Sequence, residues 1–92
     1  GVISVTANVA PGPMARLCAA ALAGAFVKAC ALNRELIPLH MKLFVEANPI
    51  PIKWALQQMG RIEGGIRLPL TPLAEGFHPI VRGALLAAGV LR

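Results

Sequence analysis

The sequence contains no tyrosine and no aspartate, and few of its side chains are aromatic or charged. Without aspartate the chain cannot form an aspartate-rich calcium loop, and without tyrosine no phenol can serve as a general acid or base. The two cysteines, Cys18 and Cys30, form no Cys-x-x-Cys pair and no disulfide framework. We therefore expect a reducing, cytoplasmic location.

Neither a membrane nor a nucleic acid is a predicted partner. The longest charge-free helical stretch, residues 17–27, is shorter than the roughly 18 apolar residues that a spanning helix needs, and we expect no signal peptide. The net charge is +5, but the basic residues are spread along the chain without a run. Nucleic-acid binding favours a clustered basic stripe, so an acidic neighbour or an anionic ligand is the milder interpretation.

Apolar side chains are in surplus, at 57% of the residues, against about 45–50% in an ordinary domain. A chain of this length hides only about 60–65% of the surface that its unfolded form exposes. We therefore expect part of the apolar surface to face other protein, either the rest of a larger domain or a neighbouring subunit. Gly1 stands where a first Met would be, which fits a segment of a longer protein.

The pattern predicts one strand followed by helices. Residues 1–5 are a short β-branched run typical of a buried strand, whose pairing partners must come from elsewhere. Residues 6–8 then turn the chain, and the apolar spacing predicts a helix over 13–23 that ends at Gly24.

A longer helix is predicted over residues 25–45, with two apolar stripes that imply neighbours on two sides. After it, Asn48 is a candidate cap for a helix that ends at Gly60, residues 64–73 form an extended connector, and a last helix covers 79–88. We call the two stripes of the long helix the outer stripe (Phe26, Cys30, Ile37, Met41 and Phe44) and the inner stripe (Leu32, Leu36, Leu39 and Leu43).

Four side chains could in principle bind zinc, but their spacings match no paired-ligand pattern: Cys18, Cys30, His40 and His78. We expect both cysteines to pack as small hydrophobes and His78 to begin the last helix. His40 forms either a buried acid–base pair with Asn33 or, as we prefer, a polar contact that is satisfied near Pro38.

No lysine is predicted to act as a nucleophile. Lys28 and Lys42 lie on the polar face of the long helix, and Lys53 lies near the start of the next one without a desolvated pocket around it. We assign no catalytic residue, no metal ligand and no cofactor to this chain. The end of the predicted strand, residues 4–8, is the one place where we expect a substrate contact. For Thr6 and Asn8, turn and cap hydrogen bonds are an equally good explanation.

Four runs carry a resemblance to a known family. They are Gly-Val-Ile-Ser-Val-Thr-Ala-Asn at 1–8, Leu-Ile-Pro-Leu-His at 36–40, Leu-Phe-Val-Glu-Ala-Asn-Pro-Ile-Pro-Ile-Lys-Trp-Ala-Leu at 43–56, and Arg-Leu-Pro-Leu-Thr-Pro at 67–72. The whole chain resembles the C-terminal part of the dihydrodipicolinate synthase family, which belongs to the pyruvate-dependent class I aldolases.

The resemblance implies an α/β fold, a TIM (β/α)₈ barrel in the parent protein. Residues 1–23 would be its last strand and helix, and residues 24–92 a helical C-terminal extension, so that this chain is mostly α by itself. It also implies a homotetramer that joins pyruvate to a lysine as a Schiff base. The pyruvate is then condensed with aspartate semialdehyde to give 4-hydroxy-tetrahydrodipicolinate in lysine and diaminopimelate biosynthesis.

Of the family's substrate contacts only Ile3, which lines the pyruvate site, falls in this chain. The Schiff-base lysine and the relay tyrosine belong to earlier strands, so the segment alone is predicted to be inactive. Two alternatives stay open: a free-standing helical interaction module, and a related aldolase with another acceptor aldehyde.

Overall fold

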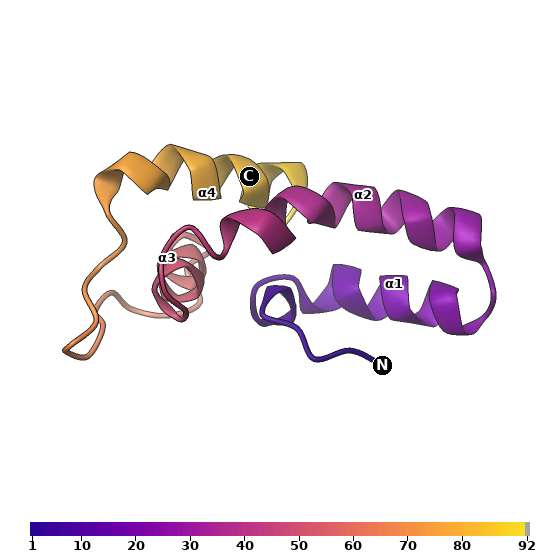
Figure 1. Ribbon diagram of the computed structural model, residues 1–92, viewed down its shortest axis with the longest axis horizontal. Helices are drawn as coiled ribbons and strands as arrows, with labels where there is room; N and C mark the ends of the chain where they lie inside the picture. The colour runs from indigo at the N-terminus through magenta and orange to yellow at the C-terminus, as the bar shows by residue number, and fades with distance from the viewer. Residues whose placement is uncertain (92) are drawn as a thin grey trace.

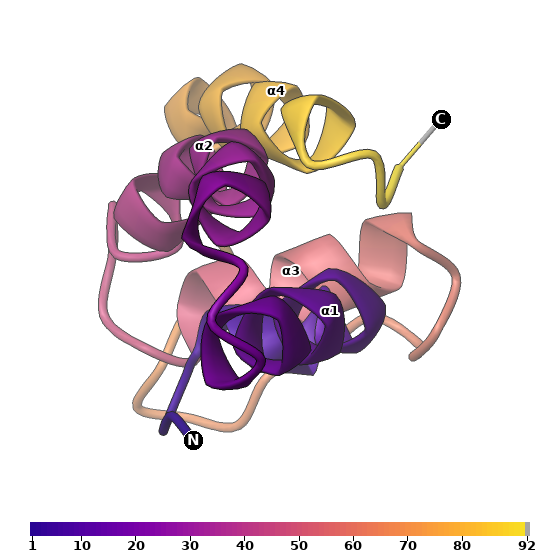
Figure 2. The ribbon, with the colours of Figure 1, turned by 90° about the vertical axis from the view of Figure 1, so that its right-hand side faces the viewer.

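The computed structural model describes residues 1–91, which form four α-helices and two short 3₁₀ helices (Figure 1). Helices α1 and α2 form an antiparallel pair joined by a tight turn, and α4 runs along the opposite side of α2. Figure 2 shows α2 and α4 as one layer above α1 and α3. In chain order the elements are η1 (Thr6–Asn8), α1 (Pro11–Leu22), α2 (Phe26–Lys42), α3 (Ile50–Gln58), η2 (Glu75–Phe77) and α4 (His78–Ala87).

The predicted strand at residues 1–5 has no regular secondary structure in this chain, and no strand occurs within residues 1–91. The physical reason is that a strand forms only when a neighbour pairs with its backbone groups. Val2 and Ile3 are 61% and 108% exposed, so these apolar side chains have no cover here. The segment leads directly into η1, which confirms that the chain turns at residues 6–8.

Helices α1 and α2 follow the apolar spacing of the sequence. Helix α1 starts at Pro11, two residues earlier than predicted, because a proline in the first turn needs no amide partner. Gly24 follows it with a φ of +77°, the left-handed conformation that ends a helix and favours glycine. Helix α2 continues through Pro38 and ends three residues earlier than predicted.

The second half of the chain alternates helices with extended connections. Helix α3 begins at Ile50 after Pro49, and Asn48 makes no side-chain cap, so the predicted cap is wrong. Prolines at the start of the helix have no N–H group, so a capping side chain there has fewer amides from which it can accept a hydrogen bond. The connector over residues 64–73 has no helix, as predicted. Helix α4 then begins at His78 and is followed by Gly89 with a φ of +73°.

One core joins all four α-helices. The inner stripe of α2 supplies its centre, because Leu36, Leu39 and Leu43 are at most 1% exposed. Helix α2 packs against both α1 and α4, and α3 contacts α4. The other buried apolar residues of this core are Val9, Ala10, Met14, Ile50, Ile52, Ala55, Leu73, Val81, Ala84, Leu85 and Ala88.

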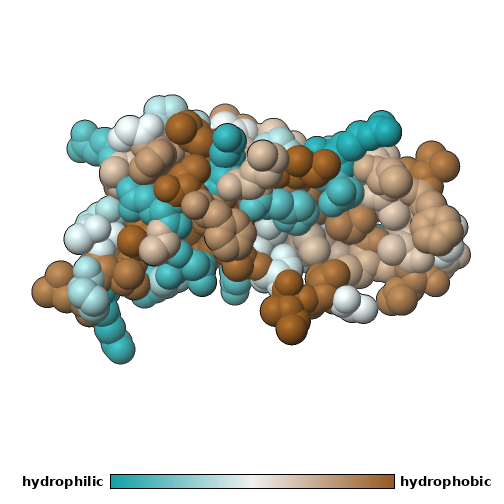
Figure 3. All heavy atoms as spheres, in the orientation of Figure 1, coloured by the Kyte–Doolittle hydropathy of each residue, from teal (hydrophilic) through white to brown (hydrophobic). Residues whose placement is uncertain are grey.

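The outer stripe is left uncovered by the part of the chain that the structure describes. Phe26, Met41 and Phe44 are 68%, 64% and 60% exposed, so α1 and α4 pack against the long helix while the side that carries the outer stripe stays open. Brown, apolar atoms gather at the end where α1 meets α2 (Figure 3), where Leu22 and Val27 are also exposed.

The elongated shape of the chain agrees with its uncovered apolar surface. The chain measures 43 by 22 by 21 Å, and its Cα radius of gyration is 13.7 Å. A compact domain of this length has a radius of about 12 Å. Within the described part of the chain, no helix has the length and apolar character that crossing a bilayer requires.

Candidate functional site

Thr6 is the one side chain with a polar group that is fully buried within residues 1–91, at 2% exposure. Its Oγ1 lies 2.6 Å from Nδ1 of His40, which is half-buried near the end of α2. This hydrogen bond joins residues 34 positions apart, and it links the end of the predicted strand to the long helix. Buried polar groups in folded proteins nearly always have such a partner.

The side chains on either side of Thr6 do make local turn bonds. The hydroxyl of Ser4 accepts a hydrogen bond of 3.1 Å from the Ala7 amide. The side-chain amide of Asn8 donates one of 3.0 Å to the Val5 carbonyl. The turn interpretation therefore describes Asn8, whereas the Thr6 hydroxyl has a long-range partner that neither sequence interpretation named.

His40 contacts Thr6 rather than Asn33. No hydrogen bond between His40 and Asn33 occurs in the described part of the chain, so the predicted acid–base pair is wrong. The preferred interpretation, a satisfied polar contact, fits His40. Ile3 lies three positions before Thr6 in the sequence, and its side chain is fully exposed.

A second cluster of rings lies between α3 and α4. His78 is the first residue of α4, which confirms its predicted place, and its Nε2–H donates a 3.0 Å hydrogen bond to the Leu73 carbonyl. The ring of His78 stacks on Trp54, with centroids 4.6 Å apart. The guanidinium of Arg82 lies 5.7 Å from the centre of the same indole and donates to Gln58 Oε1 over 2.7 Å.

The lysines and cysteines are exposed or half-buried. Lys28 and Lys42 are exposed, as predicted, and Lys53 is half-buried on α3. Cys18 is half-buried, but Cys30 is exposed on the outer stripe, so the expected core packing of Cys30 is wrong. It is exposed because that face of α2 is left uncovered by residues 1–91. Within residues 1–91, no three His, Cys or Glu side chains come together as metal ligands would.

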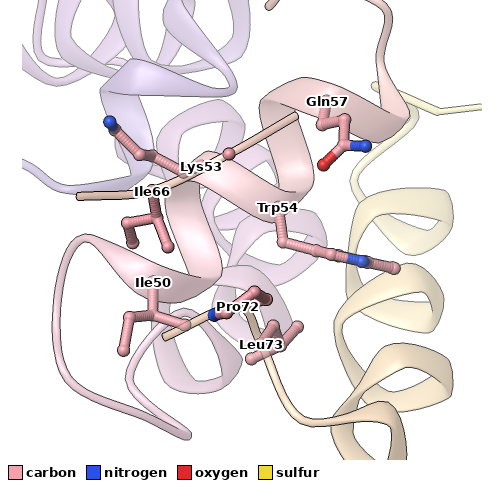
Figure 4. A pocket seen from close by; sticks show the side chains of 8 residues that line it. Ile50, Lys53, Trp54, Gln57, Ile66, Pro72 and Leu73 are labelled. Atoms are coloured by element: carbon pink, nitrogen blue, oxygen red, sulfur yellow. The ribbon is translucent and has the colours of Figure 1, made fainter. Parts of the chain in front are cut away.

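Two hollows lie next to residues discussed above. The smaller, of about 40 Å³, lies between α3 and the connector and is shown in Figure 4, where Trp54 points toward α4 and Lys53 points away. It is far below the roughly 300–1,000 Å³ of a small-molecule site. The larger, an open hollow of about 550 Å³, lies against η1 and the start of α1, and residues from the end of α3 and from 61 and 90 complete its lining.

Sequence reasoning missed the partners in both clusters. The sequence marks Thr6 and His40 as candidates separately. Helical spacing does not indicate that these two side chains, 34 residues apart, are in contact. The spacing of Trp54 and Arg82 along the chain did not predict their contacts, because stacking between two helices depends on how the helices pack. The available hints were a polar residue directly after the predicted strand and a histidine beside an apolar stripe.

Comparison with known proteins identifies the origin of this arrangement. Residues 1–88 match the Dihydrodipicolinate synthetase family. The chain belongs to that family. It is 62% identical over 90 residues to the 4-hydroxy-tetrahydrodipicolinate synthase of Azoarcus sp. (strain BH72), covering 98% of this chain and 31% of that protein. The chain therefore spans about a third of the length of its relatives in the dihydrodipicolinate synthetase family.

Solved structures of the same family have the same fold. The chloride-inhibited dihydrodipicolinate synthase from Acinetobacter baumannii, complexed with pyruvate, has a TM-score of 0.92 at 54% identity, over 99% of this chain and 31% of that one. A monomeric dihydrodipicolinate synthase variant has a TM-score of 0.93 at 48% identity, over 99% and 30% of the two chains. The helices of this chain thus match a portion of dihydrodipicolinate synthase structures.

Proposed function

We propose that this chain is the C-terminal part of a lyase that condenses pyruvate with aspartate semialdehyde to give 4-hydroxy-tetrahydrodipicolinate. The observation that carries the proposal is the likeness over almost the whole chain, at 62% identity, to a 4-hydroxy-tetrahydrodipicolinate synthase. The product feeds lysine and diaminopimelate biosynthesis, and free cysteines fit a cytoplasmic location for the parent protein.

In this proposal residues 1–23 are the last strand and helix of a (β/α)₈ barrel, and residues 24–92 are a helical extension packed on it. The unpaired residues 1–5 support it, because Val2 and Ile3 are exposed as barrel strand residues would be without their neighbours. Ile3 then contacts pyruvate at the pocket end of that strand.

The exposed apolar surface is covered by the rest of the parent protein. The outer stripe and the N-terminal segment supply apolar faces that a folded protein seldom leaves open. We propose the remainder of the barrel as the first partner and other copies of the parent protein as the second, in a homotetramer. A monomeric dihydrodipicolinate synthase variant matches this segment, which supports the barrel rather than the tetramer as its first partner.

The chemistry belongs to residues outside this chain. A lysine amine adds to the carbonyl carbon of pyruvate and water leaves, which forms the imine. Loss of a methyl proton gives the enamine, whose carbon attacks the aldehyde carbon of the acceptor. Lys28 and Lys42 are exposed to water, and Lys53 lies by a hollow of only about 40 Å³, so none of these three lysines lies in a desolvated pocket large enough to hold pyruvate.

Borohydride trapping tests whether the Schiff-base lysine lies outside this chain. Incubated with pyruvate and borohydride, the 92-residue chain should gain no covalent adduct by mass spectrometry, whereas the full-length parent should gain one on a lysine upstream of residue 1. A stable adduct on Lys28, Lys42 or Lys53 would contradict the proposal.

The acceptor aldehyde is tested separately. With pyruvate present, the parent protein should consume aspartate semialdehyde in preference to sugar-acid aldehydes. Consumption of another aldehyde with a higher kcat/KM would assign the protein to a related aldolase. A parent protein that forms no adduct at all would instead favour a helical interaction module.

A further inference from the structure

The hydrogen bond between Thr6 and His40 joins the end of the predicted strand to the C-terminal extension. We propose that His40 is a positioning residue for the pyruvate site: it fixes Thr6, and through the turn at Thr6 it fixes the strand end that carries Ile3. This inference rests on the proposed function, because it assigns a role to His40 in pyruvate binding. It gives the extension a part in a site that the extension does not itself line.

The anchor at the His40 end is rigid. His40 lies in the last turn of α2, next to Leu39 and three residues before Leu43, the residue that follows the helix, and both leucines are 0% exposed. That stretch of helix is fixed by the central core, with α1 on one side and α4 on another. Figure 1 shows η1, in indigo, beneath the C-terminal half of α2. A group attached there keeps its position, because packed helices do not shift freely.

The connection from Thr6 to the strand end is made by short local bonds. The Thr6 carbonyl accepts hydrogen bonds from the amides of Val9 and Ala10, at 3.0 and 2.9 Å, which closes the turn. The hydroxyl of Ser4, the neighbour of Ile3, accepts from the Ala7 amide at 3.1 Å. The backbone beside Ile3 is therefore tied to η1, and η1 is tied to His40.

Burial makes this bond costly to lose. Thr6 is 2% exposed, so water cannot easily replace His40 as the partner of its hydroxyl. If Thr6 and His40 only stabilised the fold, replacing either one would lower the unfolding temperature and leave the substrate affinity unchanged. A residue that positions the strand end also changes the affinity for the substrate held there, because misplacement of a contacting group weakens binding.

The test uses the full-length parent protein. Thr6→Val keeps the shape of the side chain and removes the hydroxyl, while Thr6→Ser keeps the hydroxyl. At His40, Asn places a polar atom where Nδ1 lies, whereas Gln places it nearer Nε2, so His40→Asn is the matched control for His40→Gln. Steady-state kinetics give KM for each substrate, and thermal unfolding gives stability.

We expect Thr6→Val and His40→Gln to raise KM for pyruvate about three- to tenfold, the change that losing one hydrogen bond produces, with the KM for aspartate semialdehyde nearly unchanged. Thr6→Ser and His40→Asn should stay within about twofold of the parent, since each keeps a bonding partner. The double variant Thr6→Val/His40→Gln should be no worse than Thr6→Val, because both changes remove the same bond.

A folded Thr6→Val protein with the parent's KM for pyruvate would overturn the inference. If Thr6→Val does not fold, equal KM values for His40→Asn and His40→Gln would overturn it instead. Both outcomes leave the proposed function intact as long as the parent forms a borohydride-trapped adduct with pyruvate. Absence of that adduct would overturn the proposed function and this inference together.

Discussion

The rings of Trp54 and His78 stack across the junction of α3 and α4, with centroids 4.6 Å apart and planes inclined by 20°. The Arg82 guanidinium approaches the same indole, and His78 is held by the Leu73 carbonyl. One indole therefore connects the start of α4, the connector before it and α3. This junction holds α3 against the rest of the extension, since direct contacts between α3 and the other helices are few.

Truncation of the indole should loosen that junction. Trp54→Ala in the full-length protein is expected to lower the free energy of unfolding by about 2–3 kcal/mol, less than for a fully buried tryptophan because Trp54 is half-buried. Urea unfolding measures the loss. Trp54→Phe keeps a stacking ring and should lose less than half as much. Equal losses for the two variants would show that stacking contributes little here.

Two adjacent leucines on α4 should differ sharply. Leu85 is 0% exposed and Leu86 is 49% exposed, because α4 turns one face to the core and the other outward. Leu85→Ala should destabilise the 92-residue chain by about 2–5 kcal/mol, and Leu86→Ala by well under 1 kcal/mol. Denaturant midpoints of the two purified variants compare them directly. Similar losses would contradict the packing described for α4.

The sequence was sufficient to locate the helices. Apolar spacing together with Gly24, Gly60 and Gly89 placed each α-helix within a few residues, because those glycines take positive φ values that end helices. The inner stripe was found in the same way, since helical periodicity determines which residues share a face. Local signals of this kind do not depend on what lies beyond the segment.

Contacts between distant segments could not be predicted. Nothing in the two stripes of α2 indicated which one this chain covers, since both have the same period. The predicted strand at 1–5 needed a paired neighbour, and residues 1–91 contain no other strand. The bond from Thr6 to His40 depends on how η1 lies beneath α2, and spacing along the chain carries no information about that.

Gly24 and Gly83 make a matched pair of glycines. Gly24 has a φ of +77° at the end of α1, whereas Gly83 lies within α4 with open space where a Cβ would stand. Gly24→Ala should lower the free energy of unfolding by about 1–2 kcal/mol, because alanine is strained in the left-handed region. Gly83→Ala should raise it by about 0.5–1 kcal/mol, since alanine favours the helix interior. Thermal unfolding of both variants checks the opposite signs, and a stabilising Gly24→Ala would contradict the turn.

The exposed outer stripe predicts how the 92-residue chain behaves when it is purified alone. Phe26 and Met41 are 68% and 64% exposed, so copies of the chain should associate through them to remove apolar area from water. Phe26→Ser/Met41→Ser should shift the sedimentation profile toward the monomer. Lys42→Ser, at another exposed position of α2 on its polar side, should leave the profile unchanged.

The same double variant should destabilise the full-length protein. There the outer stripe is proposed to be covered, so polar serines would face apolar neighbours and the free energy of unfolding should fall by about 2 kcal/mol or more. Urea unfolding of the parent and of the double variant provides the measurement. Two results together would contradict this: the wild-type 92-residue chain sediments as a single monomer, and the double variant leaves the free energy of unfolding of the parent unchanged. This face of α2 would then be exposed in the complete protein as well.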